Sequence, residues 1–149
     1  SIVNGGNLMR PFLVKENTGL QGHRVYEPVV VRRVMSAETA NLMREMMNAA
    51  AEKGESKLAI VPGYRIGGKT GTASIPLKGG YTSSKTIASF VGFAPYENPR
   101  FVVLVKIDEP SDTPWASLVA SPVFSSVTRQ ILTYMRVPPA TPAIAQVRK

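Results

Sequence analysis

The feature that most constrains the fold is a segment rich in glycine and proline near the middle of the chain. Residues 63–70 read Gly-Tyr-Arg-Ile-Gly-Gly-Lys-Thr, which matches the phosphate-binding loop pattern G-x-x-x-x-G-K-T. That loop requires a helix to begin at the Lys-Thr pair, because the helix N-terminus and the loop amides hold the phosphates. Gly71 and Pro76, followed by two more glycines, exclude such a helix. Residues 64–73 are therefore predicted to form an extended strand rather than a nucleotide-binding loop.

Two apolar segments after this strand predict an antiparallel sheet. Thr86 to Phe93 and Phe101 to Ile107 are strand-like, and Pro95 to Pro99 joins them as a turn of hairpin length. Parallel pairing would need a crossover helix, and the segment before Phe101 offers none. We therefore expect three antiparallel strands, with Ser74 to Lys85 as a mobile polar loop that borders a cleft.

A strand and a helix are predicted before this sheet. Val29 to Val34 is rich in β-branched residues and predicts a strand. Ser36 can cap a helix whose last turn carries Lys53, just before Gly54. An apolar stripe at helical spacing consists of Ala40, Met43, Met47 and Ala50. The methionines in this stripe are interpreted as core residues rather than ligands.

A second helix is predicted near the C-terminal end. Apolar residues recur there every three or four positions, at Val119, Val123, Val127, Ile131 and Tyr134. This stripe is expected to pack on the sheet, with Pro122 near the start of the helix, where proline is tolerated. The opening residues 1–6 have the pattern of a last helical turn with a glycine C-cap. The whole pattern predicts an α+β fold.

Composition excludes several classes of function. The net charge of +8 comes from scattered lysines and arginines without interleaved aromatic residues, so nucleic acid is not an expected partner. Cysteine is absent, which excludes disulfides and thiolate metal sites. The apolar run Phe101 to Val105 is far shorter than the roughly 20 residues of a membrane helix, and we find no signal peptide.

One motif and the residues around it resemble a known family. Lys69-Thr70-Gly71-Thr72-Ala73 resembles the K-T-G motif of serine penicillin-recognising enzymes. Matching segments follow at 88–95, 99–105, 107–110 and 120–124, and Asn4-Gly5-Gly6 with Pro11 also fits. The series resembles a monofunctional penicillin-binding protein of the cell-division or elongation type. The resemblance covers residues 1–136, and the proline-rich residues 137–149 are predicted to be a disordered basic tail.

The resemblance implies a β-lactamase/transpeptidase-like fold and a role in peptidoglycan D,D-transpeptidation without metal or cofactor. Lys69 would place positive charge beside the catalytic serine and help to attract the substrate's terminal carboxylate. Thr70 and Thr72 would bind that carboxylate through their hydroxyl groups. Gly71 would let an acyl-D-Ala-D-Ala stem peptide or a β-lactam lie along the strand edge. The Thr72 backbone N–H would supply one oxyanion-hole donor.

The sequence departs from the family pattern because two of its three motifs are missing. No lysine has a serine three positions before it and no asparagine has one two positions before it, so S-x-x-K and S-x-N are both absent. We therefore expect a C-terminal fragment, without a nucleophile and inactive alone, that the N-terminal portion of the same domain completes. The parent would lie outside the cytoplasmic membrane on an N-terminal anchor. A β-lactam-sensing or pseudo-enzymatic module is one alternative, and the disfavoured nucleotide-binding loop protein is the other.

Two other residues were weighed as functional candidates. His23 is the only histidine, and its glycine-rich surroundings favour a surface role over catalysis. Trp115, in a proline-rich loop before the last predicted helix, is expected to pack rather than to serve as a ligand platform, although it could rim the cleft.

Overall fold

The computed structural model describes residues 1–20 and 22–140, and its chain separates into two compact units. The first unit is Ser1–Met43 and the second is Arg44–Lys149, so the boundary falls inside the helix α1 (Ala37–Lys53). Each unit is described by itself. None of the helices in the described residues is both long and apolar enough to cross a membrane.

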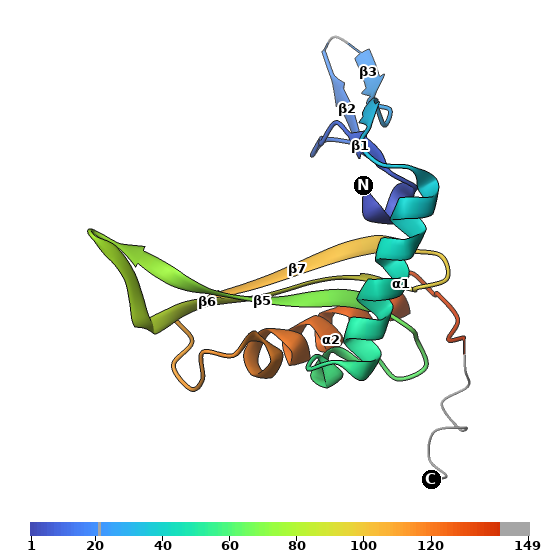
Figure 1. Ribbon diagram of the computed structural model, residues 1–149. Helices are drawn as coiled ribbons and strands as arrows, with labels where there is room; N and C mark the ends of the chain where they lie inside the picture. Colours follow the sequence, from blue (N-terminus) through green and yellow to red (C-terminus); the bar gives the residue numbers. More distant parts are fainter. Residues whose placement is uncertain (21, 141–149) are drawn as a thin grey trace. The chain divides into compact units, whose positions relative to one another are not determined.

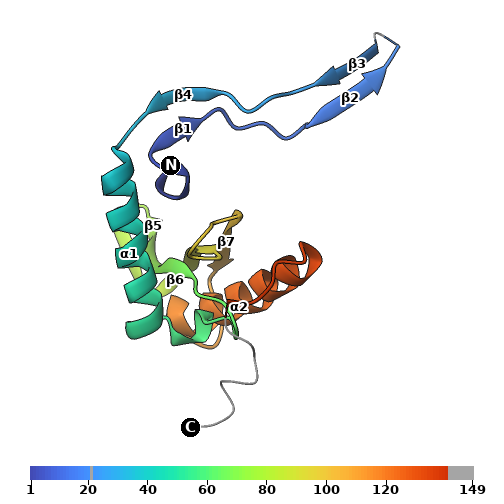
Figure 2. The ribbon, with the colours of Figure 1, turned by 90° about the vertical axis from the view of Figure 1, so that its right-hand side faces the viewer.

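The first unit is a series of short antiparallel strands. A 3-10 turn, η1 (Ile2–Asn4), ends at Gly5 with a φ of 75°, as its glycine C-cap pattern predicts. Strand β1 (Asn7–Met9) pairs with β4 (Val30–Arg33), and β2 (Glu16–Gly19) pairs with β3 (Gly22–Val25). Figure 2 shows both pairs along one extended arm. The predicted strand at 29–34 is confirmed, and the β2–β3 hairpin was not predicted.

Helix α1 confirms the predicted caps. Ser36 Oγ accepts the Thr39 N–H at 3.1 Å, and the helix ends at Lys53, just before Gly54. Its predicted stripe is only partly correct: Ala40 is buried and Met47 is half-buried, but Met43 is exposed.

The second unit contains the predicted three-stranded antiparallel sheet (Figure 1). Its strands are β5 (Gly67–Leu77), β6 (Gly80–Ala94) and β7 (Phe101–Asp108), in the order β5-β6-β7. Thr70 pairs with Phe90, as the strand prediction requires, and no helix begins at the Lys-Thr pair. The geometry therefore excludes the nucleotide-binding loop, which the sequence had only disfavoured.

The predicted loop from Ser74 to Lys85 is wrong. Strand β5 continues to Leu77 and β6 begins at Gly80, so the two strands form one long hairpin with a tight turn. Pro76 is accommodated because β5 is an edge strand and its register shifts between Ser74 and Pro76. Gly79 adopts a φ of 95°, which a glycine can provide in the turn at little steric cost.

Helix α2 (Ala116–Tyr134) lies along one face of this sheet (Figure 1). The helix was predicted, but its packing stripe is only partly correct: Val119 packs against the core, whereas Val123 is 42% exposed and Tyr134 is 88% exposed. The buried residues are Ala116, Ala120, Ser121, Phe124, Thr128 and Leu132. The prediction followed the spacing of the β-branched valines, which lie on a neighbouring stripe of the helix. The small alanines of the buried stripe let the helix approach the sheet and leave room for Phe124. Pro122 also lies further inside the helix than expected.

Polar contacts fix the beginning of β5. Asn48 of α1 is 5% exposed, and its Nδ2 donates to the Ile66 carbonyl at 2.6 Å while its Oδ1 accepts from Arg65 at 2.6 Å. Tyr64 Oη donates to the Val137 carbonyl at 2.7 Å, and the Ala140 N–H donates to the Gly63 carbonyl at 3.0 Å. Residues 137–140 thus belong to the packed unit, while the rest of the predicted tail, 141–149, lies outside the described residues.

Candidate functional site

The predicted site residues lie on the free edge of the sheet. Strand β5 is at the end of the order β5-β6-β7, so among the described strands it has a partner on one side only. Lys69, Gly71 and Thr72 pair with Val91, Ser89 and Ala88 of β6. An edge strand leaves half of its backbone N–H and C=O groups unpaired, so an extended peptide can add to it.

Alternation along β5 divides the site residues between two faces. Gly68, Thr70 and Thr72 share the face that α2 covers, since a side chain at Gly68 would lie 2.4 Å from Phe90 Cζ, in the core. Lys69 and Gly71 share the opposite face, where Lys69 is exposed. The threonines therefore face one way and the lysine the other, with the free edge between them.

Both threonine hydroxyls already accept a hydrogen bond. Lys69 Nζ donates to Thr70 Oγ1 at 3.1 Å and to the Thr70 carbonyl at 3.2 Å. The Ala116 N–H, in the first turn of α2, donates to Thr72 Oγ1 at 3.3 Å. A hydroxyl has one proton and two acceptor lone pairs. Because a lone pair of each oxygen is occupied, each hydroxyl keeps its proton for another acceptor.

The contact with Thr72 also brings the positive end of a helix dipole to the site. The N-cap residue of α2 is Trp115, which makes no side-chain capping bond. Thr72 takes over that role from the neighbouring strand, and the partial positive charge of the helix N-terminus favours a nearby anion. Trp115 itself is 61% exposed, which contradicts the expectation that it is a packing residue.

Gly71 is close to one flexible side chain. Ser89 Oγ donates to the Gly71 carbonyl at 3.2 Å, and a Cβ added at Gly71 would lie 2.8 Å from that same Oγ. The serine can turn away, so a small side chain at 71 would disturb the strand edge more than the fold. Sequence reasoning gave no role to Ser89 or to the Ala116 N–H, since neither belongs to the K-T-G motif.

A shallow hollow borders the motif on the side of α1. It measures about 150 Å³ and is lined by Ala50, Gly54, Glu55, Ser56, Lys69 and Thr70. The arrangement provides a cation, two hydroxyl donors and an open strand edge, which are the groups that bind an extended peptide with a carboxylate. In the described residues no group of three or more His, Cys, Asp or Glu side chains could hold a metal ion. His23, on the β2–β3 hairpin, is exposed and shares a 3.1 Å hydrogen bond with Thr18.

Comparison with known proteins decides the family. The model of the penicillin binding protein transpeptidase domain matches residues 1–129. This chain belongs to that family. Stage V sporulation protein D of Bacillus subtilis is 36% identical over 141 residues, which cover 92% of this chain and 22% of the relative. A probable peptidoglycan D,D-transpeptidase PenA of Neisseria flavescens is 41% identical over 113 residues, or 74% of this chain and 28% of the relative.

Solved penicillin-binding proteins confirm the α+β transpeptidase fold. The transpeptidase domain of penicillin-binding protein 3 from Burkholderia pseudomallei superimposes with a TM-score of 0.79 at 39% identity, over 95% of this chain and 41% of that domain chain. Penicillin-binding protein 3 of Mycobacterium tuberculosis, solved in complex with ampicillin, gives 0.74 at 28% identity, over 95% of this chain and 34% of that one. The chain thus spans only about a quarter of the curated relatives described above.

Proposed function

We propose that this chain forms the substrate-binding edge of a peptidoglycan D,D-transpeptidase whose nucleophile lies in a segment that the chain does not span. The observation that supports it best is the pair of threonine hydroxyls on β5. Each accepts a hydrogen bond, Thr70 from Lys69 and Thr72 from Ala116, so each can donate its proton to a substrate carboxylate. In this proposal an acyl-D-Ala-D-Ala peptide, or a β-lactam, lies along the free edge of β5 with its carboxylate at these hydroxyls.

The chemical step would be acyl transfer through a serine. The serine oxygen attacks the carbonyl of the penultimate D-alanine, its proton passes to a general base, and the terminal D-alanine leaves as the free amino acid. The amine of a neighbouring stem peptide then takes the acyl group and releases the serine. Lys69 would supply positive charge near these groups, and the Thr72 backbone N–H one of the two oxyanion-hole donors. Gly71 keeps the edge free of a side chain where the substrate backbone approaches.

The proposal is tested by acylation of the complete protein with fluorescent penicillin. Lys69→Ala removes the cation from the site, and Gly71→Val places a branched side chain on the strand edge. Losing one oxyanion-hole donor slows catalysis by about a hundred- to a thousandfold, and we expect effects of that order on the acylation rate. Lys106→Ala, which removes an exposed lysine from β7 of the same sheet, is the matched control and should label at the wild-type rate. Equal rates in all variants would refute the proposed roles.

The role of the Thr72 hydroxyl is tested by varying the carboxylate of the ligand. Thr72→Val removes the hydroxyl and keeps the shape, whereas Thr72→Ser keeps the hydroxyl. A hydrogen bond to a charged group contributes about 1.5–3 kcal/mol, so Thr72→Val should slow acylation by a carboxylate-bearing penicillin at least about tenfold. The same variant should change little with the methyl ester, which carries no charge. A loss of the same size with both ligands would indicate a purely structural residue.

The isolated 149-residue chain should form no penicilloyl adduct, because it lacks a serine with a lysine three positions later. Mass spectrometry after penicillin treatment would show an unchanged mass. A stoichiometric adduct on any of its serines would contradict the assignment. For the complete protein, stable acylation without transfer to an amine would support the β-lactam-sensing alternative instead of a transpeptidase. The extracytoplasmic, membrane-anchored location of the parent is part of this proposal.

A further inference from the structure

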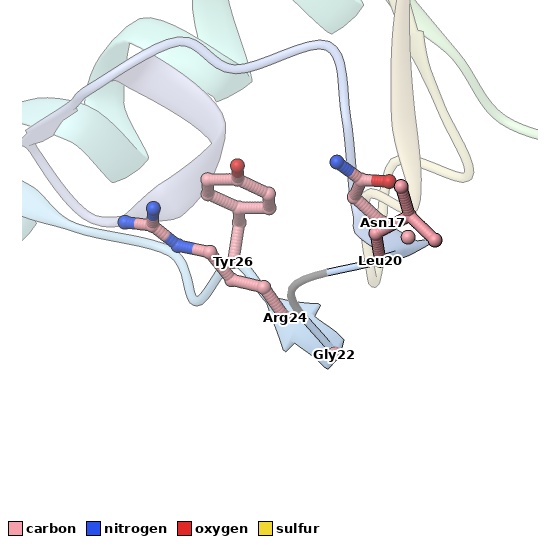
Figure 3. Close-up of a pocket in the computed structure, with 6 residues that line it drawn as sticks. Asn17, Leu20, Gly22, Arg24 and Tyr26 are labelled. Carbon is pink, nitrogen blue, oxygen red and sulfur yellow. The ribbon is translucent and has the colours of Figure 1, made fainter.

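One face of the β2–β3 hairpin carries a hollow that the proposed transpeptidase site does not use (Figure 3). The register pairs Asn17 with Arg24, and alternation places Tyr26 on the same face. Gly19 and Gly22, the pair next to the turn, add no side chain to that face. The hollow measures about 480 Å³, with Arg24 and Tyr26 on one side and Asn17 and Leu20 on the other.

Arg24 is oriented for binding but has no anionic partner. Its guanidinium carbon lies 4.8 Å from the centroid of the Tyr26 ring, a cation–π contact. Within the described residues this guanidinium makes no hydrogen bond or ion pair. A stacked guanidinium still presents its N–H groups in the plane of the fork, which matches the two oxygens of a carboxylate. The ring thus holds Arg24 in place while its donors stay available.

The surroundings of Arg24 are predominantly positive. A second hollow of about 360 Å³ shares Arg24 and Tyr26 with the first, and Arg10 lines it. Glu27 is the one acidic residue that lines either hollow. The two hollows are therefore lined by two arginines and one carboxylate, and this excess of positive charge favours an anionic occupant.

Large apolar side chains accompany this charge. Leu20, at the turn, is 109% exposed relative to a reference residue, and Leu13 is 103% exposed. Phe12, which lines the second hollow, is 45% exposed. Exposed apolar side chains beside polar ones mark interaction surfaces, and arginine and tyrosine are among the residues that contribute most of the binding energy at interfaces.

We propose that the β2–β3 hairpin is a docking surface for an acidic, extended segment of a partner protein. Carboxylates of that segment pair with Arg24 and Arg10, and an apolar side chain of the segment packs on Leu20. Both β2 and β3 have one unpaired edge in the described sheet, so an extended segment can also add backbone hydrogen bonds. This inference rests on residues of the first unit and does not depend on the proposed transpeptidase activity.

The test uses the complete protein and a synthetic peptide of repeating Glu-Glu-Leu labelled with fluorescein. Fluorescence anisotropy should show saturable binding that weakens as salt is raised, because exposed charges are screened. Arg24→Ala should weaken binding about tenfold or more, the loss typical of an interface arginine. Arg24→Lys should lose nearly as much, since lysine keeps the charge but not the planar fork. Arg100→Ala removes an exposed arginine from the second unit and should bind like the wild type.

A local probe separates docking on the hairpin from general attraction to a basic protein. The 149 residues contain no cysteine, so Leu20→Cys adds one to this chain for an environment-sensitive dye. Binding of the peptide should shift the dye emission, and a Lys-Lys-Leu peptide should not. The proposal is overturned if Arg24→Ala and Arg100→Ala bind the peptide equally. It is also overturned if phosphatidylglycerol vesicles bind more tightly than the peptide with the same dependence on Arg24, since the occupant would then be a lipid surface.

Discussion

The two units of the chain both rest on antiparallel strand pairs, yet only the second has a substantial apolar core. Phe90, Phe93 and Phe124 are each at most 1% exposed in the second unit. In the first unit, every described residue of β2, β3 and β4 is exposed. An isolated two-stranded ribbon is only marginally stable in water, whereas three strands under a helix can bury a common face. The comparison shows that similar backbone pairing can serve different purposes. The second unit provides most of the buried apolar core and hence the stability, whereas the strands of the first unit provide exposed side chains.

The strongest test of this difference is to remove the central aromatic residue of the second unit. Phe124 is fully buried, and its ring centroid lies 4.6 Å from that of Phe90. Phe124→Ala should lower the free energy of unfolding by about 3–5 kcal/mol, measured by urea denaturation. Leu20→Ala, at the exposed turn of the first unit, should stay within about 0.5 kcal/mol of the wild type. Equal losses would mean that the first unit carries a comparable share of the stability.

A smaller effect is expected from adding a methyl group to the core rather than removing a ring. A Cβ at Gly68 would lie 2.4 Å from Phe90 Cζ and 2.9 Å from the Val91 carbonyl oxygen, which is backbone and cannot turn aside. Gly68→Ala should therefore destabilise the second unit by about 1–3 kcal/mol in the same assay. Gly80→Ala is the matched control, because no atom lies within 4 Å of its added Cβ. Wild-type stability of Gly68→Ala would show that the sheet and α2 are loosely packed.

In the first unit, we expect a polar contact to matter most. Arg33 donates through Nη1 to the Gly5 carbonyl at 2.7 Å and so ties β4 to the chain's first turn. Arg33→Ala should reduce local stability by about 0.5–1.5 kcal/mol, the contribution of one hydrogen bond. Hydrogen exchange at the Val34 amide, which bonds to the Gly6 carbonyl at 2.8 Å, would measure it. Arg32→Ala should leave that exchange unchanged; equal acceleration in both variants would indicate a general effect of charge.

The smallest effect on stability is expected at the proposed docking surface. Arg24 is exposed, and its only described side-chain contact is the Tyr26 ring. Arg24→Ala should change the free energy of unfolding by less than about 0.5 kcal/mol, in the range of ordinary surface substitutions. A larger loss would assign Arg24 to the stability of the hairpin and separate it from the role in binding.

The sequence predicts elements well where short-range signals coincide. The serine cap and following glycine delimit α1, and apolar runs separated by a proline-rich turn predict β6 and β7. The hairpin β2–β3 was missed because Leu20 and Val25 are the only large apolar residues in 16–25, so the segment shows no apolar alternation. The strand at 74–77 was missed because Pro76 was read as a loop residue, although an edge strand tolerates it. The packing face of α2 depends on the shape of the sheet on which it packs. The spacing of the valines contains no information about that shape.

The site was predictable as a motif but not as a set of contacts. Lys69 to Thr72 pair with β6 as a strand should. The hydrogen bond from Ala116 to Thr72 joins residues 44 apart, and no local pattern relates them. This hydrogen bond forms only when the sheet and α2 pack together. The donor that orients Thr72 could therefore not be identified from the sequence.

The contact between Tyr64 and Val137 has a consequence for biosynthesis. It joins residues 73 positions apart, and it lies just before the strand that carries Lys69. The ribosome adds Lys69 long before it adds Val137. During the synthesis of the residues between them, the nascent chain contains β5 but cannot form the hydrogen bond from Tyr64 to Val137. Arrested chains that end before Val137 should be cut by protease near residues 63–73, and longer ones should resist. A messenger truncated between the two positions would thus yield a product that is degraded, not a less active form of the protein.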